Sequence, residues 1–265
     1  MPNQKAALEG VELAYKEQGK GQAVVLLHGF CGSSAYWDKL LPLLPDDIRV
    51  IAPDLRGHGE STAPEGPYPM EAFAADIVQL FGKLDMGKPI LLGHSLGGYI
   101  TLALAEKQPE LLKAFGLIHS TGTPDSEEAK EGRLKGIQTI QEQGLPAFID
   151  GLIPKLFAPA HLESMPEAVQ EAKRIGLATS PDGAKASLEG MRTRPDRNDV
   201  LRQTKLPVLL VAGEHDKIVP PERAFAASGE AAVQRKLDGV GHMSMMESRR
   251  LWPLRSSTSC ARFNG

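Results

Sequence analysis

The chain has 265 residues, 42% of them hydrophobic and 24% charged, and its 30 basic and 33 acidic residues give a formal net charge of −3. These values are typical of a globular protein with a sizeable core, and no block of like charges suggests a nucleic-acid or membrane-surface partner. The apolar runs are too short for a membrane span, and the first residues lack the apolar stretch of a signal peptide. Two cysteines cannot build a disulfide framework or a zinc site. We therefore expect a cytoplasmic enzyme.

Short apolar runs alternate with segments of helical periodicity along much of the chain. A hairpin turning near residues 9–10 comes first. In chain order, the predicted strands that follow are 23–27, 50–52, 89–92, 114–118, 208–211 and 232–237. Helices are predicted at 33–44, 70–84 and 99–107, from apolar residues at helical spacing. Strands that alternate with helices imply right-handed crossovers, so the predicted fold class is α/β, with a mostly parallel sheet covered on both faces.

Residues 122–199 break this alternation, because they contain no convincing strand and are rich in charge, glycine and proline. We expect helices at 126–143, 146–157, 166–177 and 181–191. The expected organisation is therefore a core of residues 1–121 and 200–265 with a helical insertion between them. The second of these helices carries an apolar stripe that either packs the insertion onto the core or lines part of a substrate pocket. Its candidate pocket residues are Phe148, Leu152, Ile153, Leu156 and Phe157.

The segment Gly93-His94-Ser95-Leu96-Gly97 matches the pattern G-x-S-x-G between a predicted buried strand and a predicted helix. Turning from strand to helix in so few residues forces Ser95 into a strained conformation, and the flanking glycines relieve the crowding. The hydroxyl then stands clear at a helix start, where the dipole favours negative charge. Ser95 is therefore the candidate nucleophile; the alternative is a tight turn that happens to contain a serine.

A serine hydroxyl becomes a good nucleophile only when a base accepts its proton. Among the seven histidines, His242 is the best candidate, because it follows the last predicted strand in a loop that contains glycine. His119 also follows a strand and is expected to line the site rather than act as the base. His28, His58, His94 and His161 lie in segments with other roles, and His215 directly precedes the candidate acid.

The base needs a carboxylate that orients its ring and stabilises the imidazolium. Asp216 directly follows the strand 208–211, whereas the alternatives Glu214 and Asp238 are placed less well. The order Ser95, Asp216, His242 is the nucleophile–acid–base order associated with this architecture. The competing interpretation of Asp216 is a solvated loop carboxylate.

Acyl transfer also requires preset donors for the oxyanion of the tetrahedral intermediate. The backbone N–H of Leu96 lies directly after the nucleophile. A second donor comes from the loop after the strand 23–27, where the N–H of Phe30 is the first choice and that of Cys31 the fallback.

Taken together, these motifs resemble those of the α/β-hydrolase family over about the first 120 residues and over 207–247. The matching segments are His28-Gly29-Phe30, the loop 54–61, Gly93–Gly98, Gly213–Asp216 and Gly241-His242. The resemblance implies an α/β-hydrolase fold, a helical cap over 122–199 that shapes the pocket, and no metal or organic cofactor. The chain also has no dinucleotide loop in context, no Walker motif and no paired metal ligands. Ser95 argues against the dehalogenase and epoxide-hydrolase branches, which use an aspartate there.

The expected activity is that of a carboxylesterase-like serine hydrolase, whose partners are a small-molecule acyl substrate and water. Carbon–carbon bond hydrolysis and cofactor-free perhydrolysis are alternatives on the same residues, and a ligand receptor with residual turnover is a third. Cys31 is expected to be a buried free cysteine rather than a redox-sensitive thiol.

The tail 248–265 departs from the family, which usually ends in an amphipathic helix. Pro253 interrupts any such helix, and residues 256–260 have no helical periodicity. We therefore expect this tail to be weakly packed.

Overall fold

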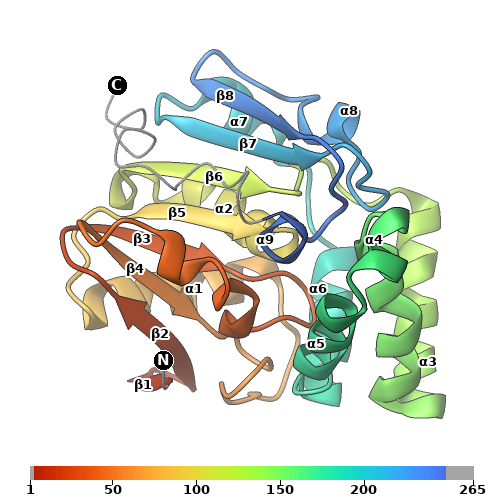
Figure 1. Cartoon of the computed structure of the whole chain (residues 1–265). Coiled ribbons are helices and arrows are strands. Elements are labelled where there is room, and N and C mark those ends of the chain that lie inside the picture. Colours follow the sequence, from red (N-terminus) through yellow and green to blue (C-terminus); the bar gives the residue numbers. More distant parts are fainter. Residues whose placement is uncertain (1–2, 249–265) are drawn as a thin grey trace.

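The structure, a computed structural model, describes residues 3–248 (Figure 1). Within this range an eight-stranded sheet has the order β1-β2-β4-β3-β5-β6-β7-β8. Its strands are β1 Gln4–Leu8, β2 Val11–Gln18, β3 Gln22–Leu27, β4 Ile48–Pro53, β5 Ile90–His94, β6 Ala114–Ile118, β7 Val208–Gly213 and β8 Ala232–Leu237. The β1–β2 and β2–β4 pairs are antiparallel and the other pairs are parallel. The prediction of a mostly parallel α/β sheet is confirmed.

Helices cover both faces of this sheet. The α-helices of the described range are α1 Met70–Lys83, α2 Leu96–Lys107, α3 Glu127–Leu152, α4 Pro159–Ser164, α5 Pro166–Gly176, α6 Pro181–Arg192, α7 Asn198–Gln203, α8 Pro221–Ala224 and α9 Ser244–Glu247. Helices α1 and α2 pack on each other, and α2 packs on β5 and β6. In Figure 1, α9 lies in front of the sheet and α2 behind it. No helix of residues 3–248 combines the length and the apolar character of a bilayer span.

The central strands owe their apolar runs to burial on both faces. Every residue of β5, β6 and β7 is buried, and so is all of β3 except its first residue. A strand that is covered on both sides has no solvent face, so apolar and polar residues do not alternate along it. These strands form a rigid platform, and each of them ends at the same edge of the sheet.

One predicted helix differs from the structure for a local reason. The segment 33–44 forms two 3-10 turns, Ser34–Trp37 and Leu41–Leu43, because a continuous helix would require an N–H that Pro42 lacks. The helices predicted at 126–143 and 146–157 correspond to the two halves of α3, which are separated by a non-helical kink at Gly144 (φ +86°); the second half continues into the 3-10 turn Ile153–Leu156. The short helices α4, α7 and α8 were not predicted.

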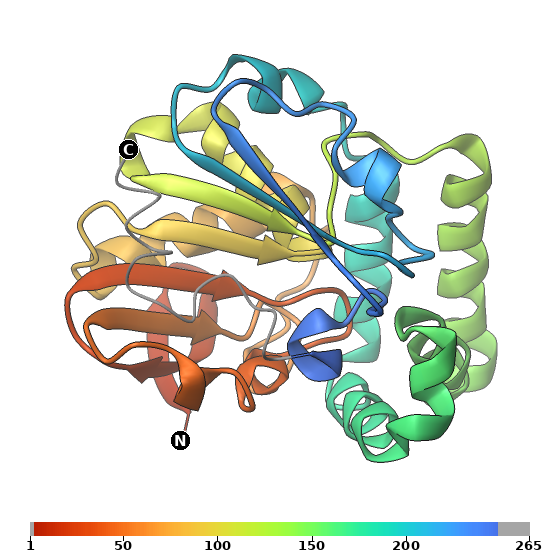
Figure 2. The same cartoon turned by 45° about the horizontal axis from the view of Figure 1, so that its top comes forward.

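Helices α3 to α6 lie together beside the carboxyl ends of the parallel strands (Figures 1 and 2). Helix α3 packs against α6. The backbone N–H of Ser180 donates to the carbonyl of Gly57 at 2.9 Å, which ties this helical group to the loop after β4. The expectation for the C-terminal tail concerns residues 249–265, which lie outside the described residues.

Candidate active site

The carboxyl ends of neighbouring parallel strands bring the predicted site residues together. Ser95 follows β5, Asp216 follows β7 and His242 follows β8, while Phe30 lies in the loop after β3. In open parallel sheets this edge is where ligands bind, because the loops that leave the strands converge there.

Ser95 has φ +51° and ψ −112°, a backbone conformation that residues other than glycine rarely adopt. The turn is held on both sides: the Ser95 N–H donates to the Ile118 carbonyl at 2.9 Å, and the Ser120 hydroxyl donates to the Ser95 carbonyl at 2.7 Å. A Cβ on Gly93 would lie 2.1 Å from the Gly97 carbonyl oxygen, so the turn requires glycine at position 93. The strain expected at Ser95 is therefore present.

Asp216 and His242 form a buried hydrogen-bonded pair. His242 Nδ1 lies 2.8 Å from Asp216 Oδ2, while Asp216 Oδ1 accepts the backbone N–H groups of Ile218 and Val219, each at 2.9 Å. Burial alone would raise the pKa of Asp216, but the attraction of His242 and the hydrogen bonds from His119 and His242 hold that pKa well below its ordinary value. The carboxyl group is thus an anion at neutral pH, suited to stabilising an imidazolium.

Ser95 and His242 face the same cavity, which has a volume of about 160 Å³. Because His242 Nδ1 is engaged by Asp216, its Nε2 is the nitrogen available to a substrate or to the serine hydroxyl. Across residues 3–248 the structure records no hydrogen bond between the Ser95 hydroxyl and the His242 ring.

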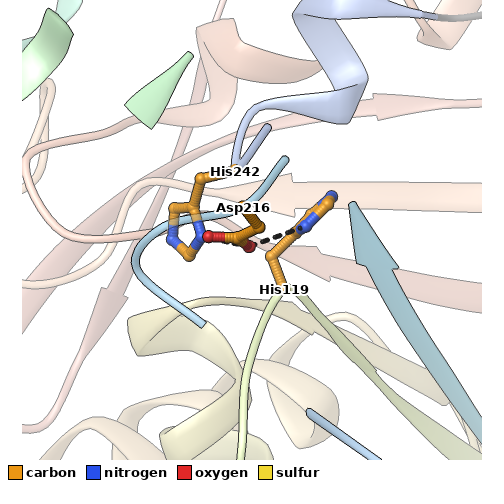
Figure 3. Close-up of side chains that lie close together, drawn as sticks. All are labelled: His119, Asp216 and His242. Atoms are coloured by element: carbon orange, nitrogen blue, oxygen red, sulfur yellow. Dashed lines mark hydrogen bonds and ion pairs between the residues drawn. The ribbon is translucent and has the colours of Figure 1, made fainter. Parts of the chain in front are cut away.

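His119 does not line this cavity, although we expected it to. Its side chain is fully buried behind Asp216, so that the carboxylate lies between two imidazole rings (Figure 3). His119 Nδ1 is 3.1 Å from Asp216 Oδ2 and 3.2 Å from the Gly213 nitrogen, and its Nε2 is 2.7 Å from the Ser244 hydroxyl. With its proton on Nδ1 the ring donates to Asp216 and accepts from Ser244; with its proton on Nε2 it donates to Ser244 instead, and Nδ1 accepts the Gly213 N–H. Burial lowers the pKa of His119, so the ring is neutral at pH 7.

Within residues 3–248, His119, Asp216 and His242 are also of the types that bind metals, and their potential ligand atoms lie within 4.8 Å of one another. Their geometry matches a hydrogen-bonded unit. Both Nδ1 atoms approach the same oxygen of Asp216 at hydrogen-bond distance, and backbone donors occupy its other oxygen.

The loop that carries His242 is fixed from three directions. The His242 N–H donates to the Leu156 carbonyl at 2.8 Å, and the His242 carbonyl accepts from His94 Nε2 at 2.8 Å. The buried carboxylate of Glu247 accepts the N–H of Gly241 and of Met243, the residues on either side of His242, both at 3.0 Å. Sequence reasoning missed these contacts, because they depend on how separate segments come together in the fold.

The two expected oxyanion donors stand beside the nucleophile. Among the described residues no acceptor is recorded for the backbone N–H of Phe30 or of Leu96. A Cβ built on Gly29 would lie 3.2 Å from Ser95 Cβ, so this loop closely approaches the serine. His28 anchors it: Nδ1 donates to the Gly29 carbonyl at 2.8 Å and Nε2 accepts the Leu55 N–H at 2.9 Å.

The apolar stripe of the insertion contributes to the cavity only in part. Leu152 and Leu156 line it together with Phe30, while Phe148 lines an adjoining groove. Ile153 and Phe157 belong to the buried core and border neither space. Further lining residues that the sequence did not indicate are Tyr36, Tyr99, Arg133, Met191 and Ile218.

Cys31 is a buried free cysteine, as expected, and burial raises the pKa of its thiol. Arg56 forms a two-pronged ion pair with Asp76 at 2.6 and 2.7 Å, and its carbonyl lies 2.9 Å from His58 Nδ1. These contacts tie down the loop after β4.

Comparison with known proteins places the chain in a family. Residues 22–248 match the family described as alpha/beta hydrolase fold. A thermophilic esterase from Thermogutta terrifontis, solved with malate bound, is 34% identical, with a TM-score of 0.87 and coverage of 93% of both chains. The 2-(acetamidomethylene)succinate hydrolase of Mesorhizobium japonicum is 32% identical over 79% of this chain and 76% of its own length. The enol-lactonase of Burkholderia xenovorans is 25% identical, with a TM-score of 0.84 and coverage of 92% of this chain and 94% of its own. The chain belongs to the α/β-hydrolase family, and it is an α/β-hydrolase enzyme.

Proposed function

We propose that this enzyme hydrolyses carboxylic esters or related acyl compounds through an acyl-enzyme on Ser95. The observation that carries the proposal is that the strained Ser95 lines the same cavity as His242, which is hydrogen-bonded to the buried Asp216. The names of similar proteins, an esterase, an enol-lactonase and a hydrolase, support the reaction type.

In the proposed first half-reaction, Ser95 Oγ attacks the carbonyl carbon while His242 Nε2 takes the hydroxyl proton. Asp216 orients the ring through Nδ1 and stabilises the imidazolium. The oxyanion accepts the N–H groups of Phe30 and Leu96; losing one such donor typically costs roughly 100- to 1000-fold in rate. His242 then gives its proton to the leaving alcohol.

In the second half-reaction, water attacks the acyl-enzyme and His242 again accepts and returns the proton. We assign the insertion 122–199 the role of a cap, because Arg133, Leu152, Leu156 and Met191 border the cavity from this segment. A cavity of about 160 Å³ favours a short acyl group.

The test compares Ser95→Ala with Ser164→Ala, which removes a hydroxyl from the exposed helix α4. Ser95→Ala is expected to abolish turnover of p-nitrophenyl acetate and labelling by a fluorophosphonate probe, and Ser164→Ala to change neither. Activity of wild-type size in Ser95→Ala would refute the assignment. Faster acyl transfer to hydrogen peroxide than to water would favour a perhydrolase, and turnover only of vinylogous diketones would favour a carbon–carbon bond hydrolase.

A further inference from the structure

Arg133 stands at the junction of two spaces. It borders the cavity that holds Ser95 and His242, and it also borders a groove of about 370 Å³ that is lined mainly by the two halves of α3. Phe30 and Leu152 border both spaces as well, so the groove leads to the cavity past these three side chains. Anything that reaches Ser95 by this route passes the guanidinium.

Arg133 faces inward because of its position on α3. Ala129, Arg133 and Gly136 follow one another at spacings of four and three residues, so they share one face of the helix, and all three border the groove. Gly136 lets the Phe148 ring pack closely against this face, since a Cβ there would lie 2.9 Å from the ring.

The charges around Arg133 do not cancel. The buried carboxylate of Asp125 is shared between two guanidinium groups: it accepts from Arg133 Nε at 2.8 Å and from Arg194 Nη1 at 2.7 Å. One carboxylate between two arginines leaves one positive charge. Burial alone would raise the pKa of Asp125, but the two arginines hold that pKa below its ordinary value, so its single negative charge persists.

The surplus charge is exposed at Arg133 rather than at Arg194. Arg194 is 3% exposed, also donates to the carbonyls of Met191 and Thr123, and lies 3.9 Å from the centroid of the Tyr99 ring. Arg133 is 21% exposed, and Asp125 is its one recorded partner within residues 3–248. Its Nη1 group is therefore available to a ligand.

The groove adds to the positive field. Lys135 and Lys155 border it together with Arg133, and no carboxylate occurs among the described residues that line the groove or the cavity. Low-dielectric walls of one charge sign concentrate ligands of the opposite sign.

We propose that Arg133 forms an anion subsite, and that the enzyme acts on short acyl compounds that carry a second, free carboxylate. This inference rests on the proposed hydrolase function. The ester carbonyl lies at Ser95, the intervening methylene groups lie against Phe30, Leu152 and Leu156, and the free carboxylate binds the Arg133 guanidinium at the mouth of the cavity. A guanidinium fork matches a carboxylate better than an ammonium does, because it offers parallel N–H donors.

The test uses two esters that differ only in charge: monomethyl glutarate and its uncharged isostere, the methyl ester of glutaric acid monoamide. Wild-type enzyme is expected to prefer the anionic ester at least tenfold in kcat/KM. Arg133→Gln is expected to lower kcat/KM for the anionic ester by roughly 10- to 100-fold, mainly through KM, and to change the neutral ester less than threefold. Arg174→Gln removes the same charge from an exposed site of the cap and is expected to leave both substrates unchanged.

A second arm measures binding without turnover. Glutarate is expected to raise the melting temperature of the Ser95→Ala enzyme, and Arg133→Gln in that background is expected to abolish the shift. If Arg133→Gln does not fold, Arg133→Lys, which keeps the charge but loses the fork, is expected to bind glutarate several-fold more weakly. Equal turnover of the two wild-type esters, or no glutarate binding, would overturn the subsite. Failure of the hydrolase function would show separately, as turnover that survives Ser95→Ala.

Discussion

Glu247 is expected to be a sensitive position outside the reacting groups. Its side chain is fully buried, and it accepts the backbone N–H of Gly241 and Met243 on Oε1 at 3.0 Å and that of Ala158 on Oε2 at 2.8 Å. His161 Nδ1 lies 2.6 Å from the same Oε2. One carboxylate therefore joins the loop of the proposed base to the segment that leads into α4.

Glu247→Gln keeps the shape of the side chain and removes its charge. If the amide oxygen takes the Oε1 position, the Gly241 and Met243 bonds persist as neutral ones, but the amide NH₂ faces the Ala158 N–H and leaves a buried donor unsatisfied. That orphaned donor costs about 1–3 kcal/mol, and the two weakened bonds add to it. Relief of the desolvation of a buried charge offsets part of this. We expect the free energy of unfolding to fall by about 3 kcal/mol, a large share of a typical total.

The assay is urea unfolding at pH 7, together with kcat and KM for a short ester. Because the loop places His242, kcat is expected to fall about tenfold while KM changes little. Glu163→Gln makes the same substitution on exposed α4 and is the control. If Glu247→Gln unfolded within 0.5 kcal/mol of the wild type and kept its kcat, the carboxylate would not be the anchor of this loop.

Three further predictions concern single positions. His119→Asn places an amide donor near Nδ1 and His119→Gln places one near Nε2, so kcat/KM should fall about tenfold more in His119→Gln if the ring supports Asp216; equal values would contradict this role. Gly93→Ala should destabilise the fold by about 3 kcal/mol or more, since its Cβ would meet the backbone oxygen four residues on at 2.1 Å. Gly82→Ala, in open space on α1, is the control and should stabilise the fold by about 0.5–1 kcal/mol, both variants being measured by urea unfolding. Burial lowers the pKa of His58 from 6.5 to about 4, so between pH 6.5 and 4 the unfolded chain binds a proton that the folded chain does not. Stability should thus fall by about 2 kcal/mol from pH 7 to pH 5 on account of this residue, and a His58→Gln variant whose urea midpoint kept the full pH dependence would refute it.

The elements that the sequence predicted best are those whose requirements are local. A strand buried on both faces must be apolar throughout, and the turn at Ser95 must have glycine beside it, so β5 and the nucleophile can both be read from a few adjacent residues. Asp216 and His242 could be predicted because each lies in the loop that follows a strand. In a parallel sheet, such loops meet at one edge, and here His242 Nδ1 lies 2.8 Å from Asp216 Oδ2.

The partners of these groups could not be predicted, because their roles depend on contacts between distant segments. His119 was expected to line the pocket, and nothing in the segment around it indicates that its ring lies behind Asp216. A charged residue on a predicted helix is usually exposed to solvent, and the segment around Arg133 suggests nothing else for this side chain. One signal was present: Arg133 shares a helix face with Ala129, Gly136 and the buried Ile140, and a lone cation on such a face indicates a role inside the fold.

The contacts of the His242 loop also restrict how the proposed cap can move. The His242 N–H donates to the Leu156 carbonyl, and Glu247 holds the Ala158 N–H, so the segment 156–158 is part of the support of the base. A rigid swing of residues 122–199 would break both bonds and remove two supports of the loop that carries His242. Opening that keeps both bonds must leave the segment 156–158 in place, and the half of α3 before the kink at Gly144, which carries Arg133, takes part in neither bond. Movement of that half-helix would widen the junction between groove and cavity while the segment 156–158 stays bound to the loop of the base.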